Sequence, residues 1–342
     1  MASHLRVESS PEPAANGDPA TISFVIPVYR NRGTLRATYE QVVEMLRQAL
    51  PDLGYQFVFI DDGSDDGSLD EILDLRASDP RVTCLNFSRN FGQVPAIVAG
   101  LREAGGDAVV ILSADLQDPV ALIEEMIRQW KAGAQVVVCY RIAREDSFAA
   151  RITSRIFYRL IRYSVPNMPA GGFDFVLLDR QPARVMAELR DRNRFFQGDV
   201  LWLGFRTHFI PYERRKREVG RSQWTFWKKL KYFIDGLIST SYLPIRFMSL
   251  VGTLTALAGF AYALLVVYLR LIHETPFQGY APIMIVLLIV GGLIMTMLGV
   301  IGEYVWRIYD ETRGRPPYIV RRRFDSSVDD ESAEPASAAT RH

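Results

Sequence analysis

The sequence contains little cysteine and histidine, the residues that build zinc sites and disulfide frameworks. Two cysteines and four histidines occur in 342 residues, and no group of them has the spacing of a zinc site. Cys84 and Cys139 each lie within an apolar run typical of a buried strand. We therefore expect two inert thiols in a reducing compartment.

The signature loops of several enzyme classes are also missing. There is no G-x-x-x-x-G-K-[ST] loop, no G-x-G-x-x-G after the first apolar run and no G-x-S-x-G turn. Their absence disfavours nucleoside triphosphate hydrolysis, dinucleotide redox chemistry and acyl transfer. The formal net charge of +1 argues against nucleic acid as a partner.

Both ends of the chain are poor in large apolar residues. Residues 1–20 are rich in serine, proline and alanine, which predicts a disordered N-terminal segment and not a signal peptide. Residues 310–342 predict a C-terminal tail that is disordered after about residue 324.

Apolar residues are instead concentrated in two uncharged runs, 247–269 and 281–302. Each run exceeds the roughly 20 apolar residues that a helix needs to cross a bilayer. We expect a transmembrane hairpin over residues 245–309, the alternative being two buried helices of a soluble core.

The basic residues predict how this hairpin is oriented. Lysine and arginine precede the first run and follow the second, but the segment 273–281 between the runs has neither. The catalytic domain and both termini are therefore expected on the cytoplasmic side of the cell inner membrane. The small-residue stretches "VGG" and "GVIG" of the second run are the kind of surface through which a homo-oligomer would pack.

Residues 225–244 predict an amphipathic helix in the membrane interface. Phe226, Phe233 and Leu237 fall on one helical face, with Lys228 and Lys229 elsewhere on the helix. An ordinary surface helix is the alternative.

Residues 21–140 alternate between strand and helix patterns, which predicts that residues 21–224 form an α/β domain. Apolar strands are expected at 21–29, 55–64, 81–87, 107–115 and 134–140. Helices are expected between them at 35–50, 70–77, 93–104 and 120–133. Such crossovers imply a mainly parallel sheet with flanking helices, which binds ligands at the carboxyl ends of its strands. Residues 141–224, with a helix at 148–163 and a strand at 173–179, are expected to complete the active site.

Acidic residues follow two of the predicted strands. Asp61 and Asp62 end one strand, and Asp115 and Asp118 end another. Carboxylates at strand ends accept hydrogen bonds from a nucleoside or hold a divalent cation. We therefore expect a nucleotide together with a metal ion at this edge of the sheet.

Three of the acids in these segments, two of them new, are interpreted as structural. Asp65 and Asp66 belong to a D-D-G turn and are expected to be solvated. Asp118 precedes Pro119 at the entry to a predicted helix, where an aspartate commonly caps the helix.

Five stretches resemble the family 2 glycosyltransferases that load a sugar onto a polyprenyl phosphate. They are "FVIPVYRNRGTL", "VFIDDGSDDGS", "NFSRNFGQVPAIVAGL", "SADLQDP" and "GVIGEYVWRIYDETRGRPPYIV". The resemblance covers about residues 21–323 and includes dolichyl-phosphate mannose synthases and bacterial undecaprenyl-phosphate glucosyl and aminoarabinosyl transferases. It implies a GT-A fold and an inverting transfer from a UDP- or GDP-sugar to a polyprenyl phosphate such as undecaprenyl phosphate.

The resemblance also implies roles for individual residues. The nucleotide-sugar site comprises Pro27, Tyr29, Asp61, Asp62, Asn90, Gly92, Gln93 and Asp115. A Mg²⁺ or Mn²⁺ ion binds Asp115 and Gln117. The acceptor phosphate meets Arg141, Arg151, Ser154, Arg217 and Ser222. Catalytic roles fall to Asp115, Asp174 and Arg214.

Elementary chemistry agrees with an arginine-rich acceptor site. The second pKa of a phosphate monoester is about 6, so the lipid phosphate is mostly dianionic at neutral pH and hardly needs a general base. It does need positive charge that offsets its repulsion from the donor diphosphate, and arginine binds phosphate bidentately. Asp174 is left with two readings, an acid/base or orienting role and a structural role such as holding an arginine.

Two other functions are compatible with parts of the sequence. Ser113 stands where the family has the first acid of its D-A-D pattern, which would suit a catalytically silent lipid-binding membrane scaffold. A processive polysaccharide synthase is disfavoured, because such proteins have a Q-x-x-R-W motif and more spans, whereas Gln223 here merely precedes Trp224.

Overall fold

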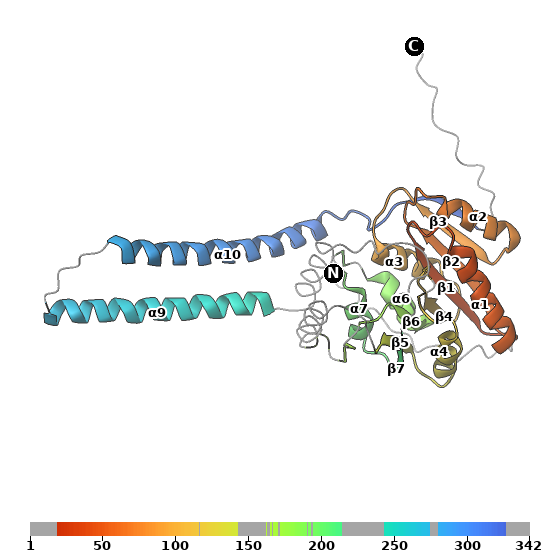
Figure 1. Ribbon diagram of the computed structural model, residues 1–342, viewed down its shortest axis with the longest axis horizontal. Helices are drawn as coiled ribbons and strands as arrows, with labels where there is room; N and C mark the ends of the chain where they lie inside the picture. Colours follow the sequence, from red (N-terminus) through yellow and green to blue (C-terminus); the bar gives the residue numbers. More distant parts are fainter. Residues whose placement is uncertain are drawn as a thin grey trace, which may run out of the picture. The chain divides into compact units, whose positions relative to one another are not determined.

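The structure is a computed structural model. The structure describes residues 19–115, 117–142, 162, 165, 167–169, 172–189, 191–192, 194–213, 243–273 and 280–325. These residues form two compact units (Figure 1). The first contains an α/β sheet and its helices, and the second contains two long helices together with Asp191 and Arg192.

The first unit is built on an eight-stranded sheet with the order β7-β5-β6-β4-β1-β2-β3-β8. Its strands are β1 (Thr21–Val28), β2 (Gly54–Asp61), β3 (Val82–Phe87), β4 (Ala108–Ile111), β5 (Val136–Arg141), β6 (Phe175–Asp179), β7 (Thr207–Tyr212) and β8 (Val320–Phe324). Only β6 and β8 run antiparallel to their neighbours. The other six strands therefore end at the same edge of the sheet, and the prediction of a mainly parallel sheet is confirmed.

Helices cover both faces of this sheet (Figure 1). They are α1 (Leu35–Ala49), α2 (Ser68–Ser78), α3 (Gln93–Glu103), α4 (Leu122–Lys131), α6 (Arg180–Glu188) and α7 (Phe196–Trp202). Helices α1, α2 and α4 share a core cluster with Phe24 and Ile26 of β1. Helix α3 packs on the other face, where Val25 points, because side chains alternate along a strand.

Most of the expected elements are present. Strand β4 is shorter than expected, because residues 114 and 115 turn away after it. Helices α6 and α7 and strands β7 and β8 were not expected from the sequence. The helix expected at 148–163 and nearly all of the interfacial helix expected at 225–244 lie outside the described residues.

The second unit consists mainly of α9 (Leu243–His273) and α10 (Tyr280–Thr312), which lie side by side (Figure 1). A Cβ atom added at Gly252 in α9 would lie 3.5 Å from the sulfur of Met297 in α10. Each helix contains a candidate membrane span, Ile245–Tyr262 and Ile289–Thr312, and no residue of either span is buried. The two long apolar helices are thus as predicted, and they indicate membrane association.

Candidate active site

Asp61 is the last residue of β2 and is fully buried at the carboxyl edge of the sheet. Its carboxylate accepts hydrogen bonds from the Asn86 side chain at 2.6 Å and from the Ser64 backbone N–H at 3.2 Å. Burial raises the pKa of Asp61 above its ordinary value, and these hydrogen bonds oppose the rise. The side chain is thereby fixed by β3 on one side and by its own loop on the other.

Asp62 holds the segment that leads from β3 into α3, residues 88–93, which we call the donor loop. Its two carboxylate oxygens accept the backbone N–H groups of Phe91 at 2.6 Å and Gly92 at 2.8 Å. Burial raises the pKa of Asp62 to about 6 and Asp61 adds to the rise, whereas the two hydrogen bonds and Arg89 oppose it. An acid that the resemblance assigns to the nucleoside therefore also shapes the donor loop.

Gly63 allows the β2 loop to approach the donor loop closely. Its φ is +69°, and an added Cβ would lie 2.6 Å from the carbonyl carbon of Arg89. Of the other predicted donor-site residues, Asn90 is exposed in the donor loop and Gln93 is exposed at the start of α3. Gly92 is the residue before α3 and has a φ of +106°.

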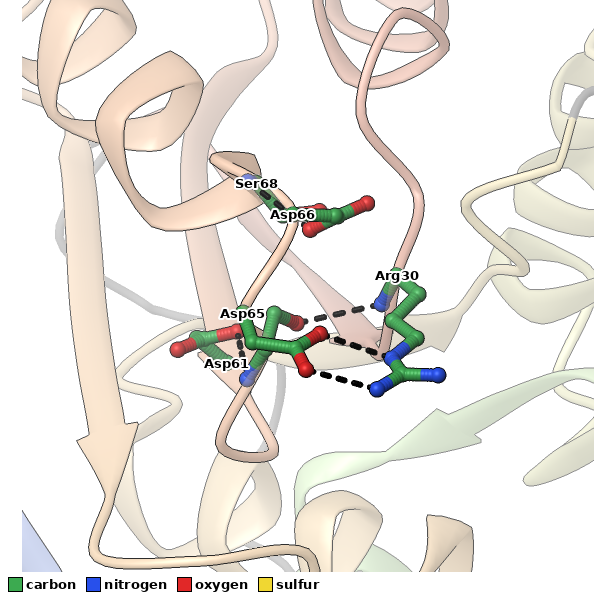
Figure 2. Close-up of polar contacts among 6 residues, drawn as sticks. Arg30, Asp61, Asp65, Asp66 and Ser68 are labelled. Carbon is green, nitrogen blue, oxygen red and sulfur yellow. Dashed lines mark hydrogen bonds and ion pairs between the residues drawn. The ribbon is translucent and has the colours of Figure 1, made fainter.

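The loop after β1 carries Tyr29 and is tied to the loop after β2 (Figure 2). Arg30 forms a bidentate pair with Asp65, at 2.7 and 2.6 Å, although the backbone of Arg30 is left-handed with a φ of +56°. Its backbone N–H donates to the Ser64 hydroxyl at 3.1 Å. Pro27 lies in β1 opposite Ile60, beside this loop.

Asp66 continues the same set of contacts. It accepts the Ser68 hydroxyl at 2.6 Å (Figure 2). It also accepts the Arg32 backbone N–H at 3.1 Å, and the Ser68 hydroxyl oxygen in turn accepts the Asn31 N–H at 2.9 Å. Asp65 is 66% exposed, as expected of a solvated turn residue, and Asp66 is half-buried. The two acids have a further role that was not expected, because they link the loop after β2 to the loop that carries Tyr29.

Asp115 follows β4 and is 5% exposed. Its Oδ1 accepts the Ser113 hydroxyl at 2.8 Å and the Gln117 backbone N–H at 3.3 Å. The carbonyl oxygen of Ala114 accepts the Thr34 hydroxyl at 2.6 Å, which fixes the turn against the start of α1. Ser113, in the place of an acid, thus helps to orient Asp115.

The metal prediction rests on Asp115 and Gln117, which is half-buried. Within the described part of the chain, no group of three or more His, Cys, Asp and Glu side chains is arranged to hold a metal ion.

A cluster of four polar side chains lies at the same edge of the sheet, near the ends of β5, β6 and β7. The Arg141 guanidinium donates to Asp174 at 2.6 Å, and the Tyr212 hydroxyl donates to Asp118 at 2.7 Å. Burial lowers the pKa of Arg141, but Asp174, Tyr212 and Asp118 outweigh it and raise the pKa above its ordinary value. Gln197 of α7 donates to the Phe173 carbonyl at 2.7 Å and to Asp174 at 3.4 Å.

These contacts change the interpretation of several residues. Arg141, expected to bind the acceptor phosphate, has a side chain that is only 6% exposed and is paired with Asp174. The N-cap of α4 is Ala121 and not Asp118, which is buried against Tyr212. Sequence reasoning missed Tyr212, although the stretch "THFIPY", with its β-branched and aromatic residues, is compatible with a strand that ends in it.

Other predicted site residues lie outside the described residues. They are Arg151, Ser154, Arg214, Arg217 and Ser222. The described part of the chain therefore brings together the donor side of the predicted site and the Arg141–Asp174 pair.

Both cysteines are buried and unpaired in disulfides. Burial raises the pKa of the Cys84 and Cys139 thiols, so that neither forms a thiolate near neutral pH. The expectation of inert thiols agrees with this environment.

Comparison with known proteins identifies relatives over most of the chain. Residues 23–187 match the family described as Glycosyl transferase family 2. An uncharacterized glycosyltransferase of Bacillus subtilis is 38% identical over 304 residues, 88% of this chain and 94% of the relative. An SfII prophage-derived bactoprenol glucosyl transferase of Shigella flexneri is 36% identical over 303 residues, 88% of this chain and 97% of the relative. A mannosyltransferase of Pyrobaculum calidifontis, solved with GDP-Man and Mn²⁺, has a TM-score of 0.44 and 15% identity, covering 64% of this chain and 63% of that chain.

Proposed function

Because the chain belongs to the family 2 glycosyltransferases, we propose that it transfers a sugar from a UDP- or GDP-sugar to a polyprenyl phosphate, specifically undecaprenyl phosphate. The observation that carries the proposal is the gathering of Asp61, Asp62, Asp115 and the Arg141–Asp174 pair at one edge of the sheet. That edge is where open α/β sheets bind their ligands. The similarity to a bactoprenol glucosyl transferase supports the choice of acceptor.

The turn after β4 suits a Mg²⁺ or Mn²⁺ ion. Asp115 and Gln117 offer oxygen ligands, which these hard cations prefer, and Mg²⁺ commonly takes one or two protein ligands and completes its shell with substrate phosphates. When bound, the ion would neutralise charge on the leaving nucleoside diphosphate. Ser113 supports this role by holding one oxygen of Asp115 in place.

The chain's own residues would position the two substrates. Asp61 and Asp62 would hold the nucleoside, and Asp62 keeps the donor loop closed by accepting two of its N–H groups. A lipid phosphate oxygen then forms a bond to the anomeric carbon while the bond from that carbon to the diphosphate oxygen breaks. The bonding electrons leave with the nucleoside diphosphate, so this single displacement inverts the anomeric configuration.

Positive charge is the main requirement on the acceptor side. Two dianionic groups must approach each other, and arginines offset their repulsion. Arg151, Ser154, Arg214, Arg217 and Ser222 are proposed for this role on the basis of the family resemblance. Asp174 is proposed to hold Arg141 at the edge of the site, which is the structural one of its two roles.

The membrane arrangement forms part of the proposal. We propose a catalytic domain over residues 21–224, an interfacial helix over 225–244, a hairpin over 245–309 and a tail over 310–342. The exposed apolar side chains of α9 and α10 support a hairpin in the inner membrane, with both termini cytoplasmic. A membrane anchor suits an acceptor whose polyprenyl chain stays in the bilayer.

Nucleotide binding separates the enzyme from a silent scaffold. We expect full-length protein to bind UDP or GDP more tightly with Mn²⁺ than with EDTA, and we expect Asp115→Ala to lose this metal dependence. Asp52→Ala, which removes an exposed carboxylate at the opposite end of β2, is the matched control and should bind as the wild type does. Folded wild-type protein that binds neither nucleotide under any metal condition would favour the scaffold.

A further inference from the structure

Strand β8 adds to the sheet at the place where the donor loop begins. It pairs antiparallel with β3, and the register shifts between Asn86 and Phe87. The Ser88 backbone N–H then donates to the Ile319 carbonyl at 3.0 Å. Bulges of this kind commonly redirect a strand next to a functional site. Residues 319–324 therefore pair with β3 and with Ser88, the first residue of the donor loop.

Tyr318, just before β8, connects to the donor loop through aromatic contacts. Its ring stacks on Phe87, with centroids 5.0 Å apart and an interplanar angle of 6°. Phe87 meets Phe91 edge-on at 5.8 Å, and the Arg89 guanidinium lies 4.1 Å from the Phe91 ring centroid. The backbone N–H of Phe91 is one of the two groups that Asp62 binds. The contacts thus form a continuous path from Tyr318 to Asp62.

The helix after the donor loop also contacts Tyr318. Arg102 of α3 donates from Nη1 to the Tyr318 hydroxyl at 3.1 Å and from Nε to the Ala187 carbonyl at 3.0 Å. Tyr318 therefore contacts the strand before the donor loop and the helix after it.

Two arginines secure β8 itself. Arg323 pairs with Glu103 at 2.6 Å, and Arg76 donates to the Asp325 carbonyl. Because these contacts hold the strand from both sides, β8 can act as a fixed support for Tyr318.

We propose that Tyr318 is a positioning residue for the donor loop and sets the affinity for the nucleotide-sugar donor. The proposal rests on the proposed function. By holding Phe87 and Phe91, Tyr318 keeps the Phe91 and Gly92 N–H groups where Asp62 accepts them. Coupling of this kind is reciprocal, so a bound nucleotide also stabilises the docking of β8. The segment that follows α10 is therefore part of the donor site and not a passive tail.

Substitutions of Tyr318 in full-length protein test the proposal. Tyr318→Ala removes the stack, and an aromatic pair contributes enough to change affinity by about three- to tenfold. We expect the KM for UDP-glucose and the Kd for UDP with Mn²⁺ to rise by that factor, while the KM for undecaprenyl phosphate stays within about twofold. Tyr318→Phe keeps the stack and should stay within about twofold of the wild type in every parameter.

Arg321→Ala, at an exposed position of the same strand, is the matched control and should behave as the wild type does. The proposal is overturned if stably folded Tyr318→Ala binds UDP as the wild type does, or if its donor and acceptor KM rise together. Wild-type protein that binds no nucleotide would instead overturn the proposed function.

Hydrogen exchange of the wild-type protein tests the proposal without a variant. UDP with Mn²⁺ should slow exchange at the amides of 320–324, since binding and β8 docking stabilise each other. Bound nucleotide that leaves exchange at 320–324 unchanged overturns the proposal.

Discussion

Asp62 illustrates how one residue can make donor binding depend on pH. Its raised pKa of about 6 means that the carboxylate, which accepts two donor-loop N–H groups, is lost as the pH falls through this value. The facing charges are Asp61, which raises this pKa, and Arg89, which lowers it. The contribution of Asp62 to donor binding is therefore present above about pH 6 and absent well below it.

We accordingly predict that UDP-glucose binds more weakly at pH 5 than at pH 7.5. The diphosphate of the donor is esterified at both ends, so the ligand does not itself titrate in this window. Asp62→Asn lacks the titrating group and should bind weakly at both pH values. Calorimetry at the two pH values checks this, and an unchanged pH dependence in Asp62→Asn would assign the effect to another group.

Tyr212 is a second single residue whose substitution should have a measurable effect, because its hydroxyl donates a hydrogen bond to the buried carboxylate of Asp118. Tyr212→Phe leaves Asp118 without this donor, and such a loss costs about 1–3 kcal/mol. We predict a lower apparent melting temperature and a several-fold fall in kcat/KM, since Arg141 also loses a neighbour that stabilises its charge. Tyr140→Phe, whose ring meets Phe209 edge-on, is the control and should change neither quantity.

At the scale of elements, α3 connects the donor loop to the core. An added Cβ at Gly100 would lie 2.3 Å from Val25 Cγ1, so the helix packs against β1 without room for a methyl group. Gly100→Ala should destabilise the protein by about 1–3 kcal/mol through overpacking. Gly105→Ala, where the nearest atom is 3.8 Å away, should be neutral in the same thermal unfolding experiment. Equal melting temperatures for the two variants would contradict the packing argument.

The elements also show which parts of the fold can be read from the sequence. The first five strands and four helices were predictable, because continuous apolar runs alternate with amphipathic helices. Strand β8, "VRRRF", was not predictable, because it is exposed and its partner β3 lies far away in the sequence. Its three arginines suit an edge strand, but they do not alternate with apolar residues and so give no sequence signal for a strand.

The candidate site was predictable to a similar degree. Residues that end their own strands, such as Asp61, could be placed at the carboxyl edge from the sequence. The pairing of Asp118 with Tyr212 depends on tertiary neighbours, since β7 joins the sheet beside β5. The same holds for Asp65, whose partner Arg30 comes from a different loop (Figure 2).

At the scale of the whole molecule, a family 2 glycosyltransferase domain is joined to two long apolar helices. The chain returns from α10 to the sheet as β8, so the polypeptide leaves the first unit before α9 and rejoins it after α10. This connectivity places the proposed anchor between two segments of the first unit.

The most direct test of the central claim is mass spectrometry of the lipid product. Full-length protein is incubated with undecaprenyl phosphate, Mn²⁺ and each member of a panel of UDP- and GDP-sugars, with Asp115→Ala as the inactive control. We predict a glycosylated undecaprenyl phosphate for at least one donor with the wild type, with inverted anomeric configuration, and none with the variant. Folded wild-type protein that binds nucleotide but yields no lipid product with any donor would contradict the account.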